Sequence, residues 1–245
     1  MKGIDKLLGV VALIALWWLL SAIVSRPLLP SPLKVAQNIS SIFFQSIFVH
    51  MTHSLFRILL SLVLAIIVGL PLGVMMGYFP HAERVLAPIV YLAYPVPKIA
   101  LLPIVMLALG VGDASKIVIL FLIVFFQIVI AVRDAIHAIP DETFYPLLSL
   151  GASFCDIFVN VLWPASLPKF FTSLRVAMAT AISVLFFTET FGTIHGMGYF
   201  IMDAWLRVSY VEMYSGIVVL SAMGLALFMM IDVIEHRACR WQYVK

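Results

Sequence analysis

The sequence contains few charged residues, few cysteines and no concentrated basic patch. Of its 245 residues only 11% are charged, and the net charge of +3 is dispersed along the chain. This distribution argues against nucleic-acid binding, which depends on a clustered basic surface. The two cysteines, Cys155 and Cys239, have no metal-ligand spacing. Both fall in segments predicted below to be cytoplasmic, where thiols stay reduced, so we expect inert thiols and no metal site.

Sequence signatures of catalysis are also lacking. There is no H-E-x-x-H zinc motif and no Walker A motif. Gly110–Asp113 (GVGD) is similar to the G-x-G-D of intramembrane aspartyl proteases, but no Tyr-Asp pair supplies a second aspartate. Gly151–Phe154 (GASF) is one residue away from the rhomboid GASG, but Ser153 lies in a predicted loop and the last two hydrophobic segments contain no histidine. We therefore predict no catalytic residue in this chain.

Hydrophobic residues are abundant, at 64% of the chain, with a mean hydropathy of +1.14. A membrane-spanning helix needs about 20 consecutive apolar residues, and several runs approach that length. Alternation at every second residue, which is typical of a β-barrel, does not occur. We predict an all-α polytopic membrane protein with about six transmembrane helices, at residues 7–24, 54–78, 86–109, 117–137, 170–191 and 212–234. No stretch indicates a separate soluble domain, so any energy-consuming or ligand-capturing domain is expected on another chain.

Basic residues at the two ends of the chain predict its orientation in the membrane. Lys2 and Lys6 precede the first span, and Arg237, Arg240 and Lys245 follow the last one. Since cytoplasmic loops carry an excess of Lys and Arg, we expect both termini in the cytoplasm. The first span is longer than a signal h-region and no A-x-A site follows it, so it is expected to stay uncleaved. Four basic residues on the predicted outer side oppose this bias: Arg26, Lys34, Lys116 and Arg207.

The third hydrophobic segment is interrupted by prolines. Pro95 and Pro97 lie in Tyr94–Lys98 (YPVPK), and Pro103 interrupts the segment again. Proline frees helical carbonyl groups, which at membrane depth is tolerated only where protein or a watery cavity surrounds the backbone. We therefore expect this segment to line a pathway. Lys98 is predicted either to attract anions there or to extend its ammonium group to an interface or an acid.

Two charged residues lie in the fifth hydrophobic segment. Glu189, between two threonines, is the only acid deep in that segment. It is predicted either to line an outer gate or pair with a basic residue there, or to be an interfacial carboxylate in water. Arg175 lies near the cytoplasmic end of the segment, where a basic residue is ordinary.

The longest stretch that differs from a plain span is Pro140–Lys169. It begins with two adjacent acids, turns at Gly151 and ends on two prolines, Pro164 and Pro168. Its apolar residues recur at helix-like intervals: Phe144, Leu147, Leu148, Phe154, Phe158 and Val161. We predict two short helices around a glycine turn, outside the lipid, with apolar faces that dock onto another surface.

Gly151 is followed, after nine residues, by Val161-Leu162-Trp163-Pro164. This spacing is similar to the cytoplasmic signature of binding-protein-dependent ABC importer permeases, which reads E-A-A, three residues, Gly, nine residues, I-x-L-P. The E-A-A of that family falls on Tyr145-Pro146-Leu147, so this half of the signature is missing. Pro146 is tolerable there because it lies in the first turn of the predicted helix, where its N–H would have no intrahelical partner. Whether Glu142 replaces the family's Glu is open.

Two further blocks resemble the nitrate/sulfonate/taurine branch of these permeases. Tyr94–Ile117 resembles the third-span region of the branch, and Phe187–Ile201 resembles its fifth-span end and outer loop. Together the matches run from about residue 50 to 235. Gly110–Lys116 within the first block is predicted to be an outer turn. His195–Gly198 within the second is predicted either to meet a solute-binding protein or to be a plain turn, and its glycines form no phosphate-binding motif.

The resemblance implies a type I ABC importer permease fold with a cytoplasmic coupling-helix hairpin. It also implies three partners: a second permease subunit, giving a homodimer, a cytoplasmic ATPase dimer that holds ATP and Mg²⁺, and an extracytoplasmic solute-binding protein. The chain itself is expected to bind no cofactor and to be no enzyme. A hairpin that packs only on its own bundle is the alternative. The residues expected to couple to the ATPase are Glu142, Tyr145, Leu148, Gly151, Ala152, Ser153, Asp156, Pro164 and Pro168.

The expected function is that of a multi-pass permease subunit of an ATP-driven importer in the cytoplasmic (inner) membrane. It is expected to move a small solute, an anion of the nitrate, sulfonate or taurine kind. The alternative is a passive channel or secondary transporter, a class that often shows inverted repeats and intramembrane acids; here no internal repeat is found, and Glu189 is the one candidate acid. The expected domains are 1–49 (N-terminal transmembrane helix and external segment), 50–235 (permease core) and 236–245 (cytoplasmic basic tail).

Overall fold

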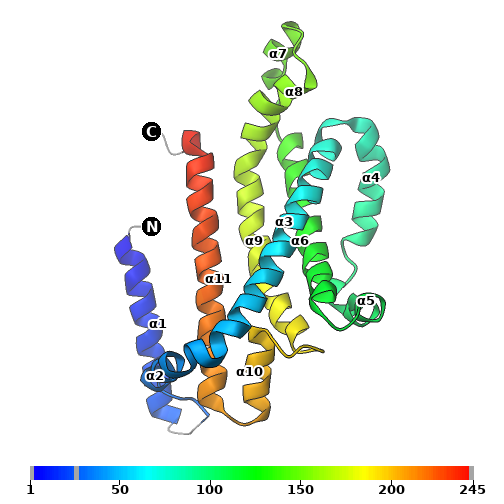
Figure 1. Ribbon diagram of the computed structural model, residues 1–245. Coiled ribbons are helices and arrows are strands. Elements are labelled where there is room, and N and C mark those ends of the chain that lie inside the picture. Colours follow the sequence, from blue (N-terminus) through cyan, green and yellow to red (C-terminus); the bar gives the residue numbers. More distant parts are fainter. Residues whose placement is uncertain (1–2, 25–27, 243–245) are drawn as a thin grey trace. The chain divides into compact units, whose positions relative to one another are not determined.

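The computed structural model describes residues 3–24 and 28–242, and all regular elements in those ranges are helical (Figure 1). The predicted all-α class is thereby confirmed. Part of the charge pattern that predicts the orientation, namely Lys2, Arg26, Lys245 and the side chain of Lys6, lies outside the described residues.

The chain forms two compact units. The first contains the residues up to Leu55 together with Glu189–Met223, and the second contains Phe56–Thr188 together with the residues from Gly224 onward. Three helices have residues in both units: α3 (Phe48–Tyr78), α9 (Trp163–Glu189) and α11 (Tyr210–Ala238).

Four further elements complete the first unit: α1 (Gly3–Val24), α2 (Pro32–Ile42), a π-helical turn (Phe43–Ile47) and α10 (Met197–Leu206). The indole ring of Trp17 in α1 stacks on Tyr214 of α11, with the ring centroids 6.1 Å apart. In Figure 1, α10 lies beside the first part of α11. The two helices approach closely at Gly216, because a Cβ there would lie 2.6 Å from a side-chain carbon of Ile201. Ring stacking and a small residue therefore hold α1 and α10 against α11.

The second unit contains α4 (Pro80–Ala93), a 3₁₀ turn (Lys98–Leu101), α5 (Leu102–Leu109), α6 (Asp113–His137) and most of α9. A hairpin between α6 and α9 consists of a 3₁₀ turn (Asp141–Thr143), α7 (Tyr145–Ser149), α8 (Phe154–Ile157) and a π-helical turn (Phe158–Leu162). The unit also includes the second part of α11 and a final 3₁₀ turn (Arg240–Gln242).

Small residues bring α3 and α6 together in the second unit. Gly69, Gly73 and Gly77 recur every fourth residue and so share one face of α3. A Cβ at Gly73 would lie 2.8 Å from the Cβ of Val132, and one at Gly77 would lie 2.7 Å from the Cβ of Ile136. Glycine is needed at such contacts because it lets two helix backbones approach. A buried apolar cluster of Met76, Val90 and Val129 then packs α4 onto the same pair of helices.

Helices occupy most of each predicted span, but the helical stretches differ in length. Four helical stretches are long and apolar enough to cross a membrane: Pro32–Tyr78, Asp113–His137, Phe154–Glu189 and Tyr210–Ala238. The pair Pro80–Ala93 and Lys98–Leu109, bent by 80°, counts as a fifth if it forms one span. The first predicted span lies within α1, whose apolar part Leu8–Val24 is shorter than these stretches.

The proline-rich third segment is broken as predicted. α4 ends at Ala93, and the chain continues through Pro95 and Pro97 into the 3₁₀ turn that precedes α5. Pro103 does not interrupt a helix, contrary to the prediction, because it lies in the first turn of α5. Proline is tolerated at that position, where its missing N–H would have no helical partner.

Two boundaries predicted from sequence are wrong. The outer turn predicted at Gly110–Lys116 is shorter, since α6 already begins at Asp113 and Lys116 is fully buried in it. The second arm of the hairpin does not end at Pro164 and Pro168, which lie within a continuous helical stretch. A π-helical turn, Phe158–Leu162, lies just before α9 and shifts the pattern of backbone hydrogen bonds there. Pro164 has no N–H to donate, and this shift lets the helix continue through it.

Candidate functional site

The hairpin of the second unit turns at Gly151 through a glycine-dependent helix end. Gly151 has a φ of 72°, a conformation that residues with a Cβ adopt at a cost. Its N–H donates to the carbonyl of Leu148 (3.0 Å), and the N–H of Ala152 donates to the carbonyl of Leu147 (3.0 Å). These two bonds are the Schellman pattern that closes helix C-termini. Gly151 and Ala152, both predicted to take part in coupling, therefore shape the turn itself.

The second arm of the hairpin begins with a capping box. The N–H of Asp156 donates to Oγ of Ser153 (3.3 Å), and the N–H of Ser153 donates to Oδ2 of Asp156 (2.9 Å). Each side chain thus satisfies an amide group that the start of a helix leaves without a partner. The roles visible for these two predicted coupling residues are structural, and both side chains remain exposed.

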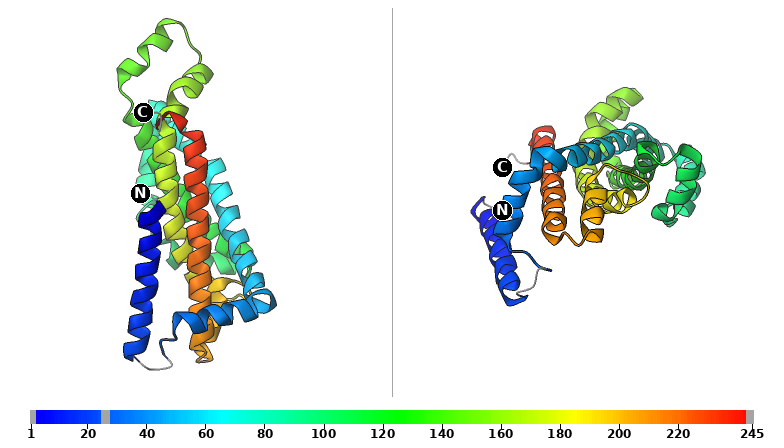
Figure 2. Two further views of the ribbon diagram at one scale, coloured as in Figure 1. Left: turned by 90° about the vertical axis from the view of Figure 1, so that its left-hand side faces the viewer. Right: turned by 60° about the horizontal axis from the view of Figure 1, so that its bottom comes forward.

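The hairpin projects beyond the ends of α6 and α9 (Figures 1 and 2), and it carries an exposed apolar face. Tyr145 is 57% exposed, Leu148 is 54% exposed and Leu150 is 85% exposed. Glu142 is exposed beside them, whereas Pro164, like Pro168, is half-buried inside α9. The structure thus brings most of the predicted coupling residues together at the tip but leaves the two prolines in the helix below.

Aromatic rings hold the base of the hairpin. The ring of Phe154 lies 5.4 Å from that of Tyr78 and 5.2 Å from that of Phe79, and Phe144 lies 6.3 Å from Tyr78. Contacts of this geometry contribute about 0.5–1.5 kcal/mol each beyond area burial. A hollow of about 430 Å³ lies between the hairpin and the ends of α3 and α6, lined by Gly77, Tyr78, Ile136, His137, Ile139, Asp141, Phe144, Tyr145 and Leu148.

Lys98 closes the end of α4. Its Nζ donates to the carbonyl oxygen of Ala93 (3.0 Å) and to that of Tyr94. The same ammonium group lies over the ring of Phe126, 4.7 Å from the centroid. A cation at the carboxyl end of a helix is favourable because the helix dipole is negative there. The positive charge is therefore fixed beside the break between α4 and α5, where the sequence places a pathway.

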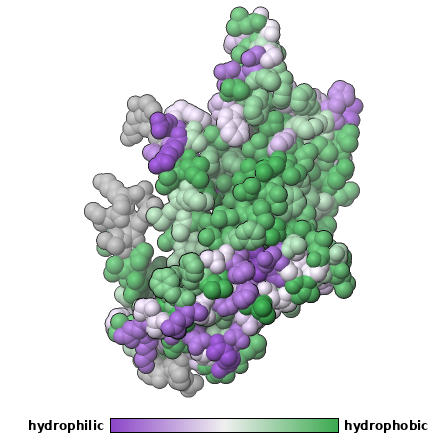
Figure 3. All heavy atoms as spheres, viewed as in Figure 1, coloured by the Kyte–Doolittle hydropathy of each residue, from purple (hydrophilic) through white to green (hydrophobic). Residues whose placement is uncertain are grey.

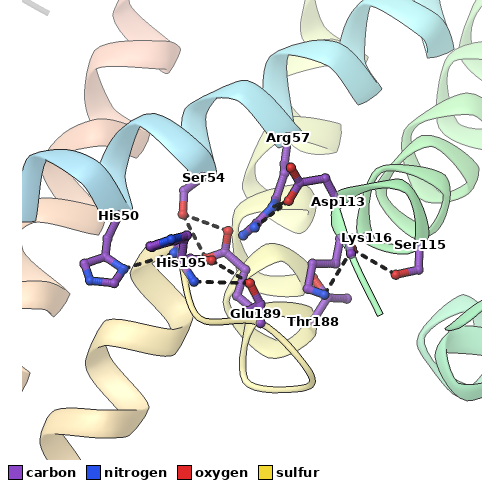
Figure 4. Close-up of polar contacts among 12 residues, drawn as sticks. His50, Ser54, Arg57, Asp113, Ser115, Lys116, Thr188, Glu189 and His195 are labelled. Carbon is purple, nitrogen blue, oxygen red and sulfur yellow. Dashed lines mark hydrogen bonds and ion pairs between the residues drawn. The ribbon is translucent and has the colours of Figure 1, made fainter. Parts of the chain in front are cut away.

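Glu189 is fully buried in the first unit (Figure 4). Ser54 of α3 donates its hydroxyl to the carboxylate (2.8 Å), and the N–H of Gly198 donates to Oε2 (2.8 Å). Ser54 also accepts from the N–H of Met197 (2.8 Å). The burial excludes the alternative of an interfacial carboxylate in water. Ser54 was not foreseen, because nothing in the sequence relates it to an acid 135 positions away.

An ion pair in the second unit, between a buried arginine and a partly exposed aspartate, was also missed from the sequence. Arg57 of α3 is 1% exposed and contacts Oδ1 of Asp113 through Nη2 (2.6 Å) and Nε (2.8 Å) (Figure 4). Lys116, one turn further along α6, donates to the carbonyl of Gly112 (3.2 Å). The signal that indicates such residues is a charge inside an apolar run, which is costly unless it is enclosed and paired.

Histidines gather at the loop before α10 in the first unit. The ring of His195 stacks on that of His53 with centroids 4.8 Å apart, and the N–H of Gly196 donates to Nδ1 of His50 (3.2 Å). This loop is therefore held against α3. Among residues 3–24 and 28–242, no group of three or more His, Cys, Asp or Glu side chains is arranged to hold a metal ion.

Arg175, expected to be an ordinary interfacial charge, joins α9 to α11. Its Nη1 contacts Oδ1 of Asp232 (3.1 Å) and also Glu235, whose side chain is buried.

Hydrophobic side chains cover a broad area over α3 and α4 (Figure 3), and exposed apolar residues there include Val63, Ile67, Ile89 and Leu92. Such a surface is suited to lipid contact.

Residues 69–238 match the family described as "Binding-protein-dependent transport system inner membrane component". The chain belongs to this family. It is a multi-pass inner-membrane permease component of a binding-protein-dependent ABC importer, and the alternative of a channel without an ATPase is set aside. In this family nucleotide binds to a separate ATPase subunit, and the permease binds no cofactor.

Relatives of this permease cover nearly its whole length. The taurine transport system permease protein TauC of Escherichia coli (strain K12) is 27% identical over 94% of this chain and 86% of its own. The formylaminopyrimidine transport permease protein ThiX of Halalkalibacterium halodurans is 27% identical over 98% of this chain and 97% of its own. The putative aliphatic sulfonates transport permease protein SsuC of Bacillus subtilis (strain 168) is 26% identical over 99% of this chain and 88% of its own.

The permease fold also matches a solved structure. A chain of the MetNI methionine ABC transporter in an inward facing conformation has a TM-score of 0.67 to this chain at 20% identity. The match covers 82% of this permease and 98% of that chain. The expected type I importer fold is thereby confirmed.

Proposed function

We propose that the hairpin Asp141–Ile157 is the surface through which the ATPase partner drives this permease. The observation that carries the proposal is the exposed apolar face on a projecting segment, with Leu150 85% exposed at its tip. Tyr145 and Leu148 are three residues apart and so share one face of α7. Burial of apolar area contributes about 25 cal/mol per Å², so such a face favours a protein groove over water. The spacing from Gly151 to Pro164 supports the same interpretation.

The continuity of the hairpin with a span would transmit the movement. Its second arm runs into α9 as one helical stretch, Phe154–Glu189, and no loop intervenes to absorb a displacement. The ring contacts between Phe154 and Tyr78 connect the same arm to α3. ATP-driven closure of the ATPase dimer would then move one hairpin in each of two permease subunits. Helical bundles that rock in response open the path to one side of the membrane at a time.

Retention of the ATPase by the tagged permease tests the proposal. Leu148→Asp is expected to release the ATPase in a pull-down, because a carboxylate buried at an interface without a partner is strongly unfavourable. The matched control is Leu206→Asp, which changes a leucine that is 69% exposed at the end of α10, and it should retain the ATPase. Wild-type retention by Leu148→Asp would refute the docking surface.

We infer that the solute is a small anion of the nitrate, sulfonate or taurine kind. The names of TauC and SsuC support this class, since they refer to taurine and aliphatic sulfonates. ThiX, named for formylaminopyrimidine, is as similar as TauC, so the decisive support has to come from this chain. That support is Lys98, whose fixed positive charge stands at the break between α4 and α5. Pro95, Pro97 and Pro103 shape the same proposed pathway.

The ligand of the solute-binding protein tests the anion proposal. We expect taurine or an alkanesulfonate, and not formylaminopyrimidine, to bind that protein and to enter ATP-loaded proteoliposomes. Lys98→Gln should lower uptake of the anion, whereas Lys34→Gln in α2 should not. A cationic or neutral ligand would overturn the anion proposal and leave the permease function unchanged.

The proposed assembly contains two copies of this chain, an ATPase dimer and an extracytoplasmic solute-binding protein. Both termini and the hairpin are proposed to be cytoplasmic, and the loop His195–Gly198 is proposed to face the binding protein. The domain limits 1–49, 50–235 and 236–245 are kept as part of this proposal. Glu189 is proposed to act on the pathway indirectly, by fixing the start of α10, because protein encloses its carboxylate.

A further inference from the structure

A groove along α4 has no role in the mechanism proposed above. It has a volume of about 570 Å³, and one residue of α6, Arg133, faces it from the other side. The residues of α4 that line it share one face, at intervals of three or four residues: Pro80, Glu83, Arg84, Ala87, Pro88 and Tyr91. With a rise of 1.5 Å per residue, this lining extends about 16 Å along the helix.

The groove changes character along its length. Its upper end, at the start of α4 and near the end of α6, carries the guanidinium groups of Arg84 and Arg133. Its lower end is apolar and finishes at Tyr91, which is 80% exposed. Beside it on α4, Ile89 is 59% exposed and Leu92 is 71% exposed. A phospholipid has the same order of parts, with a charged headgroup followed by acyl chains.

Acidic groups at the upper end are engaged by neighbours. Oε2 of Glu83 lies 3.4 Å from Nε2 of His137, and Arg133 holds Oδ1 of Asp134 through Nε and Nη2. Arg84 adds a second guanidinium group to the groove. The first turn of α4 also directs the positive end of its helix dipole toward this end. Because Arg133 already pairs with Asp134, the positive charge that this end offers to an anion comes mainly from Arg84 and the first turn of α4.

The geometry points to a binding site for an anionic phospholipid of the surrounding membrane, with its phosphate between Arg84 and Arg133. One acyl chain of this lipid then lies along α4 from the headgroup toward Tyr91. Basic pockets between transmembrane helices on the cytoplasmic side are known to bind lipid headgroups in this way. A free phosphate would leave the apolar lower end uncovered, which is why the lipid is favoured. The site holds α4 in place beside the proline break.

Lipid binding to the complete transporter tests the site. The permease with its ATPase is reconstituted into nanodiscs of equal amounts of phosphatidylglycerol and phosphatidylethanolamine, and retained lipids are counted by native mass spectrometry. Arg84→Gln and Arg133→Gln are each expected to lower phosphatidylglycerol affinity about five-fold, the effect of one basic group near an anionic headgroup. Glu83→Gln should raise the phosphatidylglycerol affinity because it removes a negative charge, and Arg84→Lys should keep most of the affinity because it keeps the positive charge.

Arg237→Gln in the last turn of α11 is the matched control, since it removes an exposed basic residue that does not line the groove. It should leave phosphatidylglycerol retention unchanged. Equal retention by the Arg84→Gln/Arg133→Gln double variant would overturn the site. If the double variant lost phosphatidylglycerol and phosphatidylethanolamine equally, the groove would be a plain apolar surface without headgroup selectivity. If it retained its lipids but changed the number of permease copies in the complex, the groove would be a contact with a second copy of the chain. None of these results depends on ATP-driven transport, so failure here leaves the proposed function intact.

Discussion

Glu189 is a carboxylate that the first unit keeps fully buried. A hydroxyl and a main-chain amide, supplied by Ser54 and Gly198, donate hydrogen bonds to it. Gly198 and Met197 form the first turn of α10, where the helix dipole favours a negative charge. The carboxylate and Ser54 together therefore fix the position at which α10 begins.

Removal of this carboxylate should destabilise the permease. Glu189→Ala is expected to lower stability by about 3 kcal/mol, because the buried donors of Ser54 and Gly198 lose their acceptor. Thermal unfolding of the purified protein in detergent measures the loss. Glu142→Ala, which removes an exposed acid of the hairpin, should have little effect. Equal stability of the two variants would contradict the role given to Glu189.

At this scale the sequence predicts which residues are unusual better than what they contact. Glu189 and Lys98 stand out as charges in apolar segments, and both prove to have specific partners. Ser54 and Asp113 could not be identified, because polar residues of ordinary type acquire significance only through contacts across distant positions.

Helix packing in the second unit depends on the glycines of α3. At Gly73 and Gly77 the backbone of α3 touches side chains of α6 directly, and no room remains for a Cβ. The hairpin depends on glycine for a different reason, because Gly151 has open space around it and a positive φ. The two cases call for different tests.

Overpacking the contact between α3 and α6 should destabilise the fold. Gly73→Val places carbon atoms within 3 Å of Val132 and is expected to cost about 1–3 kcal/mol. Gly9→Val, at a helical glycine with nothing within 4 Å, is the matched control and should change thermal stability little. A result in which both variants unfold at the same temperature would show that close approach of the helices is unimportant.

A side chain at the hairpin turn should weaken ATPase binding without unfolding the permease. Gly151→Ala is expected to cost about 1–2 kcal/mol locally, because its φ of 72° is unfavourable for a residue with a Cβ. Gly112→Ala also enters open space, but at a negative φ, and should retain the ATPase fully. Pull-down at increasing salt measures the difference, and indistinguishable curves would argue against the turn as part of the docking surface.

The sequence predicted that these helices exist more accurately than it predicted the residues at which they end. Periodicity and the position of Gly151 were enough to predict the two arms of the hairpin. Pro164 and Pro168 indicated an end to the second arm, yet the helix continues through them. A π-helical turn at Phe158–Leu162 makes this possible, and its occurrence has no clear signature in composition.

The whole molecule exposes a large apolar surface as a single chain. Exposed hydrophobic residues occur on α1, α3, α4 and α11, which is expected of a protein whose surroundings are lipid and other subunits. Composition was sufficient to predict the membrane location and the all-α class. The partners could be inferred only through resemblance, because they are separate chains.

Cysteine labelling should report the orientation of the hairpin. Cys155 is exposed, whereas Cys239 is buried, and burial together with the charge of Glu235 raises the pKa of the Cys239 thiol. Cys239 therefore has little reactive thiolate at neutral pH. We expect a membrane-impermeant maleimide to label the permease in inside-out vesicles and not in right-side-out ones. Cys155→Ser should abolish the signal, and labelling from the outer side would reverse the proposed topology.

The uninterrupted helix from Phe154 to Glu189 also restricts how this chain can vary in length. It contains 36 residues, and each residue of an α-helix turns the following ones by about 100°. One residue inserted or deleted between Ile157 and Glu189 would turn the Glu189 side chain by about 100° relative to the helical residues before the change, so its direction toward Ser54 would be lost. A substitution in this stretch changes only the contacts of one side chain. A change of length also rotates one end of the helix relative to the other about the helix axis.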